Sequence, residues 1–194
     1  MGHSALIAIR PLMSANPYAS PDFQVADLPS RQASSEPPFF AVSLSKLVIM
    51  SVCTLGLYEI YWFYRNWRCI RHREQSNIAP ALRALVALFY CYQCFARVRA
   101  YDIERNGSSP LAAGSLAVGW IVATLLWKLP DPYWWLSLLA FVFLLPVQAR
   151  ANRLNAQVSP LHKRNASIRG WDWLAVIPGG ALLLLAFLGT LLAP

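Results

Sequence analysis

Charged residues are scarce in this sequence, and carboxylates are the scarcest of them. Of 194 residues, 13% are charged, 57% are hydrophobic and only 9 are Asp or Glu. Soluble domains typically contain about 25% charged and about 45–50% apolar residues. A soluble fold of this composition would have too few polar side chains to cover its surface. The composition therefore predicts a membrane protein.

The sequence also lacks the motifs of the common active sites. It contains no G-x-S-x-G, P-loop, G-x-G-x-x-G or H-E-x-x-H stretch. Its 3 histidines lie in separate segments, and Cys91 and Cys94 form a C-x-x-C pair inside an apolar run. A zinc site there would need two more ligands at suitable spacing. We therefore expect small, buried packing groups at the cysteines, no metal, no cofactor and no enzymatic activity.

Five apolar segments dominate the chain after residue 38. They cover residues 43–64, 79–96, 111–127, 133–149 and 172–193. Because roughly 20 helical residues span the hydrocarbon core, we predict an all-α membrane domain over 39–194 in which the last three segments are transmembrane helices. The first two are predicted to be either re-entrant or interfacial helices, or full crossings. Residues 1–38 are rich in Ser, Pro, Ala and Gln, which predicts a disordered tail.

The placement of the basic residues favours the re-entrant arrangement. If all five segments crossed the membrane, the arginine-rich loop 65–83 would lie opposite the other basic loops. If the first two segments enter and leave on one side, every Lys and Arg except Lys128 lies on that side. The positive-inside rule assigns such a side to the cytoplasm. It predicts a cytoplasmic N-terminus and a periplasmic C-terminus, with five crossings as the alternative.

Two short stretches are predicted to break helices. In "TLG", Thr54 and Gly56 weaken the first segment after about half a membrane thickness. In "IPGG", Pro178, Gly179 and Gly180 predict either a kink in the last segment or the close approach of a neighbouring helix.

The stretch that follows the first break combines arginines with aromatic rings. On a helix over residues 58–74, basic side chains share one face and aromatic side chains share the opposite face. This pattern is typical of a helix along the headgroups, with arginines at phosphates; an aromatic belt at a helix end is the alternative. The predicted lipid-facing surface consists of Tyr61, Trp62, Tyr64, Arg65, Trp67, Arg68, Arg71 and His72.

Glu59 is an isolated carboxylate in the first apolar segment. Its neighbours one helical turn on are Trp62 and Phe63, so its own helix offers no cation. A buried carboxylate must be paired, hydrogen-bonded or protonated. An antiparallel hairpin of the first two segments would bring Arg83 to a similar depth. We therefore predict an ion pair between Glu59 and Arg83, with proton or cation handling as the alternative.

The motif "LSKLVIMSVCTLGLYEIYWFYRNWR" resembles the opening of a group of small bacterial membrane proteins defined only as a domain of unknown function. Their pattern is T-x-G-[ILV]-Y-x-[IL]-Y-W-x-Y, which Thr54, Gly56, Tyr58, Tyr61, Trp62 and Tyr64 match. The ending "GWDWLAVIPGGALLLLAFLG" is similar too. The resemblance implies a protein of the bacterial inner membrane, and it implies no activity.

Two hypotheses for function remain. The first is a non-enzymatic protein that organises lipid or a partner protein at the cytoplasmic face and binds anionic phospholipid headgroups. The second is a subunit of a small transporter or channel that uses Glu59 and requires a homo-oligomer or another membrane protein. The net charge of +8 does not indicate nucleic-acid binding, because the placement of the loops explains it.

Overall fold

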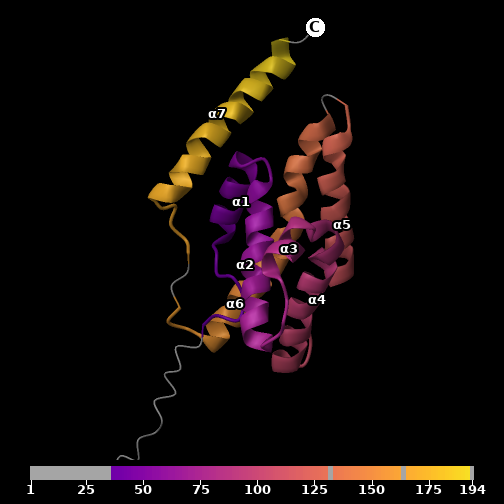
Figure 1. Ribbon diagram of the computed structural model, residues 1–194, viewed down its shortest axis with the longest axis vertical. Coiled ribbons are helices and arrows are strands. Elements are labelled where there is room, and N and C mark those ends of the chain that lie inside the picture. Colours follow the sequence, from indigo (N-terminus) through magenta and orange to yellow (C-terminus); the bar gives the residue numbers. More distant parts are fainter. Residues whose placement is uncertain (1–35, 131–132, 163–164, 193–194) are drawn as a thin grey trace, which may run out of the picture. The chain divides into compact units, whose positions relative to one another are not determined.

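The computed structural model describes residues 36–130, 133–162 and 165–192, and its secondary structure over these ranges is helical, with an isolated bridge between Val42 and Asn165 (Figure 1). Residues 1–35 of the predicted tail lie outside the described residues. The helices are α1 (Leu44–Cys53), α2 (Leu57–Glu74), α3 (Pro80–Leu85), α4 (Ala87–Asn106), α5 (Ala113–Leu125), η1 (Leu126–Lys128), η2 (Tyr133–Ala140), α6 (Phe141–Val158) and α7 (Gly170–Leu192).

The break predicted at Thr54 and Gly56 is present. Leu55 and Gly56 have φ angles of 53° and 86°, in the left-handed region that ends a helix and that glycine adopts readily. The Thr54 hydroxyl donates to the carbonyl of Met50 at 2.7 Å and accepts from the backbone N–H of Tyr58 at 2.9 Å. One side chain therefore caps the end of α1 and the start of α2.

Helices α1 and α2 form a hairpin, and the segment that precedes α1 runs along the second half of α2 (Figure 1). Arg73, near the end of α2, donates to the carbonyl of Pro38 at 3.5 Å. The backbone N–H of Phe40 donates to the side chain of Asn66 at 3.2 Å. The segment before α1 and the C-terminal end of α2 therefore lie at the same end of the domain.

The next helices return to that same end. Glu74 at the end of α2 forms an ion pair with Arg97 of α4 at 3.5 Å, and Gln157 of α6 donates to Asn106 of α4 at 3.4 Å. Figure 1 shows the C-terminal ends of α2, α4 and α6 at the same end of the domain. We call this end the arginine-rich end.

Two helices of the described chain are long and apolar enough to span a membrane. They cover Tyr133–Val158 and Asp172–Thr190, and an 18-residue stretch within each has a mean hydropathy of 1.5 and 2.0, respectively. The remaining predicted transmembrane segment, residues 111–127, forms a shorter apolar helix, Ala113–Lys128. Three full-length spanning helices are thus not confirmed, because the turn at the end of this segment stops it early.

Amide side chains of α6 hold the extended segment that precedes α1. Asn155 accepts from the N–H of Phe39 at 3.0 Å and donates to its carbonyl at 2.9 Å. Gln148 donates to the carbonyl of Phe40 at 2.9 Å, and Asn152 donates to that of Val42 at 2.8 Å. Because extended backbone in a core needs partners for its polar groups, these amides fix the first turn of the domain.

Helix α7 packs against α1 and continues without a break past Pro178. The predicted helix break at Pro178, Gly179 and Gly180 is therefore absent. A Cβ atom at Gly179 would overlap the carbonyl oxygen of Cys53, so the glycine permits close contact between helices. Much of the remaining surface of α7 is apolar and exposed, as expected of a surface that faces lipid or a partner.

Candidate functional site

Four arginines lie over aromatic rings in the part of the domain near the arginine-rich end. Measured from the guanidinium carbon to the ring centroid, Arg65 lies 5.0 Å from Phe40, and Arg97 lies 5.1 Å from Trp67. Arg73 lies 4.7 Å from Phe39 and 4.6 Å from Tyr101. Arg83 lies 4.6 Å from Trp67 and 5.0 Å from Tyr90. A guanidinium over a ring gains about 0.5–2 kcal/mol. The rings therefore hold these cations in place before any ligand arrives.

Three hydrogen-bond donors around Trp67 lack acceptors among the residues described. They are the indole nitrogen of Trp67 and one terminal nitrogen each of Arg83 and Arg97, all buried. A buried donor without a partner costs roughly 1–3 kcal/mol. A local rearrangement that brings an anionic oxygen to this cluster would remove part of that penalty.

The residues of the predicted lipid-facing surface differ in their exposure. Tyr61, Arg68, Arg71 and His72 are exposed, while Tyr64 and Arg65 are half-buried. Trp62 and Trp67 are fully buried, so the prediction is wrong for them. The aromatic face of α2 points into the helix bundle, where the Trp62 indole N–H donates to Gln148 at 2.6 Å. The basic face of α2 is the one that remains accessible.

The predicted ion pair between Glu59 and Arg83 is absent from the described structure. Glu59 instead accepts a hydrogen bond of 2.6 Å from the indole N–H of Trp120 in α5. Residues 75–79 lead from α2 into the short helix α3, which is separated from α4 at Val86. This interruption lets the guanidinium of Arg83 lie over Trp67 and Tyr90.

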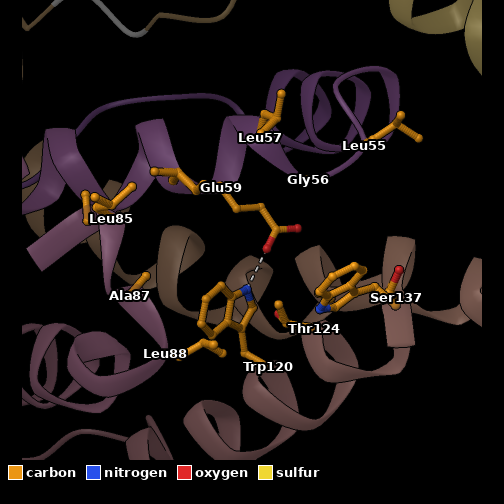
Figure 2. A pocket seen from close by; sticks show the side chains of 14 residues that line it. Leu55, Gly56, Leu57, Glu59, Leu85, Ala87, Leu88, Trp120, Thr124 and Ser137 are labelled. Carbon is orange, nitrogen blue, oxygen red and sulfur yellow. Dashed lines mark hydrogen bonds between the residues drawn. The ribbon is translucent and has the colours of Figure 1, made fainter. Parts of the chain in front are cut away.

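Glu59 lies in the wall of a cavity of about 500 Å³. Figure 2 shows its carboxylate directed toward the indole of Trp120, with Leu57, Leu85 and Leu88 around them. Glu59 is only 4% exposed. Among the residues described, the cavity is therefore a mainly apolar space with one carboxylate in its wall.

A second hollow of about 410 Å³ adjoins a buried ion pair between α1 and α7. Lys46 is 4% exposed, and its ammonium lies 2.6 Å from a carboxylate oxygen of Asp172. The same ammonium donates to Asn165 at 3.0 Å and to the carbonyl of Ser167 at 3.2 Å. The lysine therefore joins α1 to α7 and to the segment that precedes α7.

Asp102 is fully buried, although arginines stand close to it on both sides in the sequence. The Nε and Nη2 atoms of Arg150 each donate to it at 2.6 Å, and Asn106 donates at 2.8 Å. Burial by itself raises the pKa of the Asp102 carboxyl, but hydrogen bonds from Arg150, Ser109 and Asn106 outweigh burial and hold this pKa below its ordinary value. Asp102 and Asn106 lie one helical turn apart, so the sequence alone could have indicated the hydrogen bond between them.

The described residues contain no group of three or more His, Cys, Asp or Glu side chains that could hold a metal ion. Cys91 and Cys94 are buried free thiols. Comparison with protein-family models, with curated proteins and with solved structures finds no match.

Proposed function

We propose that this chain is a multi-pass protein of the bacterial inner membrane that binds anionic phospholipid headgroups at its arginine-rich end. There it organises lipid or a partner protein, without catalysing a reaction. The arginine-rich end faces the cytoplasm, and the end that carries Lys128 faces the periplasm. The segments of α5–η1, η2–α6 and α7 cross the bilayer, which leaves the C-terminus periplasmic.

The observation that carries this proposal is the set of four arginines held over aromatic rings. Anionic headgroups attract Lys and Arg near the surface by about 1 kcal/mol for each charge. Guanidinium groups suit phosphate especially well because their planar donors bind two oxygens at once. Cations held by rings lose less conformational entropy on binding than free side chains do.

The depth of the α1–α2 hairpin supports the re-entrant arrangement. Phe39 is hydrogen-bonded to Asn155, and the turn at Gly56 lines the same cavity as Ala140. Helix α6 rises about 22 Å between Ala140 and Asn155 at 1.5 Å per residue. That depth is less than the roughly 30 Å hydrocarbon core. The hairpin therefore enters deeply and returns before crossing.

Lipid selectivity tests the proposal directly. The purified protein is reconstituted into vesicles, and quenching of its tryptophan fluorescence by brominated phosphatidylglycerol is compared with quenching by brominated phosphatidylcholine. We expect a preference for the anionic lipid that falls by about tenfold when Arg65→Gln and Arg83→Gln are combined, because two ring-held charges are lost.

The matched control combines Arg99→Gln with Arg105→Gln. This pair removes the same charge from exposed side chains of α4, and we expect a loss of less than about threefold because exposed charges are screened. Equal losses in the two pairs would mean that diffuse charge alone attracts the lipid. An unchanged preference in the Arg65/Arg83 variant would reject the headgroup site.

A second candidate function is transport or conduction by an oligomer, and the buried carboxylate of Glu59 is the observation that favours it. So few helices rarely enclose a path for an ion or solute by themselves. Transport would therefore require a homo-oligomer or a partner protein. The two candidates differ in their response to substitution. Charge reversal at Arg65, Arg68 and Arg71 abolishes the organising role, whereas Glu59→Gln abolishes transport.

A further inference from the structure

We propose that the cavity beside Glu59 binds a lipophilic organic cation, meaning an ammonium or phosphonium centre that carries bulky apolar groups. The inference rests on the walls of the cavity, on the carboxylate and on the access route. It does not depend on the arginines that bind headgroups.

The walls select for an apolar occupant. Most of the lining side chains are aliphatic or aromatic: Leu55, Leu57, Ile60, Ala84, Leu85, Ala87, Leu88, Trp120, Trp127 and Ala140. Pockets of this size that are lined mainly by apolar groups bind ligands by removing apolar surface from water. A strongly hydrated ligand would lose its water shell and find few polar groups in the cavity to replace it.

The carboxylate selects for positive charge. Glu59 is nearly fully buried, and among the residues described the indole N–H of Trp120 donates a hydrogen bond to it. Taking a carboxylate out of water costs several kcal/mol unless a cation or several donors compensate. A single indole N–H compensates only in part, so a cation in the cavity completes the pairing. The Thr124 hydroxyl, which is buried and without a partner in the described structure, offers a further polar contact.

The aromatic lining favours an organic cation over a metal ion. Hard cations such as Ca²⁺ and Mg²⁺ require about six oxygen ligands, whereas the described side chains that line this cavity supply one carboxylate and the hydroxyls of Thr124 and Ser137. An organic cation instead gains from contact with the indole rings of Trp120 and Trp127. The ammonium of Lys128 lies 5.9 Å from the centroid of the Trp127 ring, so this indole is already within the range of a cation–π contact.

The rim of the cavity is apolar and accessible. Leu57 and Leu85 line the cavity and are 68% and 73% exposed, and Figure 2 shows them beside Glu59. In a bilayer these side chains contact lipid. A lipophilic cation that partitions into the membrane therefore reaches the carboxylate from the side without crossing an aqueous path.

Binding of radiolabelled tetraphenylphosphonium to the purified full chain in detergent micelles tests this proposal. We expect saturable binding at one site per chain. Glu59→Gln should weaken it by about tenfold or more, because it removes a desolvated charge that faces the cation. The matched control is Glu104→Gln, which makes the same change at an exposed carboxylate and should bind as the unmodified chain does.

Two further measurements keep the test decisive if Glu59→Gln does not fold. Leu57→Trp leaves the carboxylate in place and narrows the exposed rim, so it should also weaken binding. Lys128→Gln removes a cation near the rim and should strengthen binding by about two- to threefold, since an exposed charge is largely screened. Absence of saturable binding overturns the proposal. Unchanged binding in Glu59→Gln, or in folded Leu57→Trp, does so too, and the cavity then holds a neutral lipid chain.

Discussion

Replacing Asp102 with asparagine is expected to destabilise the helical domain by about 3 kcal/mol, because it breaks a buried ion pair and leaves one charge unmatched. Asp102 is fully buried, and Arg150 donates two hydrogen bonds of 2.6 Å to it. The side chain of Arg150 is only 19% exposed, so water cannot replace the lost carboxylate fully. The free energy of unfolding in mixed micelles, measured by titration with a denaturing detergent, checks this result.

Glu104→Gln is the control for the Asp102 variant. It lies on the same helix, is exposed, and should change the free energy of unfolding by less than about 0.5 kcal/mol. Adding Arg150→Gln to Asp102→Asn should recover part of the loss, because it removes the unmatched charge. If Asp102→Asn behaves like Glu104→Gln, the ion pair does not hold α4 to α6.

The same ion pair predicts a dependence of stability on pH. Asp102 lies beyond the apolar segment 79–96, and its pKa is held below the ordinary value of 3.8. A carboxyl whose pKa is lowered by folding stabilises the fold above its ordinary pKa, and this stability is lost as the pH falls through the lowered value. The unmodified chain should therefore lose stability below about pH 4, and Asp102→Asn should lose less over that range.

Removal of Lys46 or Asp172 is expected to have an effect of similar size, about 3 kcal/mol, because each leaves its partner without a counter-charge. Lys46 is the more deeply buried partner, so Asp172→Asn leaves an ammonium in the core with only Asn165 and a carbonyl as acceptors. The link between α1 and α7 is thereby weakened. The midpoint of thermal unfolding and the rate of proteolysis in the segment before α7 report this loss.

A double variant separates the ion pair from simple packing. Lys46→Met combined with Asp172→Leu replaces both charges with apolar groups, and such replacements of buried pairs are often neutral or stabilising. We therefore expect the double variant to be more stable than either Lys46→Met or Asp172→Leu alone. Additive losses would indicate that the two side chains act independently.

The sequence predicts the helices well because their signals are local. The five apolar segments follow from length and hydropathy, and the break at Thr54 and Gly56 follows from the readiness of glycine to adopt a left-handed conformation. The face of α2 that points inward was assigned wrongly at Trp62 and Trp67. Periodicity shows that a helix has two faces, but it does not decide whether rings face lipid or other helices, since both are apolar.

The polar contacts were less predictable because they join distant parts of the chain. Trp120 lies 61 residues after Glu59, and nothing near either residue indicates the other. Asp102 has arginines on both sides in the sequence, yet the cation that binds it comes from α6. The amides of α6 did carry a signal, since Gln148, Asn152 and Asn155 repeat at helical spacing on one face.

The side of the membrane on which residue 77 lies tests the re-entrant arrangement most directly. Labelling of the native Cys69 would report the same side poorly. Its thiol is half-buried, and burial raises the pKa of this thiol, so little of the reactive thiolate forms. A chain whose four cysteines are replaced by alanine therefore carries Asn77→Cys, with Ser108→Cys and Pro130→Cys as references. All three positions are exposed.

Intact cells are labelled with a membrane-impermeant maleimide, before and after the inner membrane is opened. The re-entrant arrangement predicts that Pro130→Cys is labelled in intact cells, and that Asn77→Cys and Ser108→Cys are labelled only after opening. Labelling of Asn77→Cys in intact cells would place the end of α2 on the periplasmic side. It would separate the C-terminal ends of α2 and α4 and contradict the gathering of the arginines on one side.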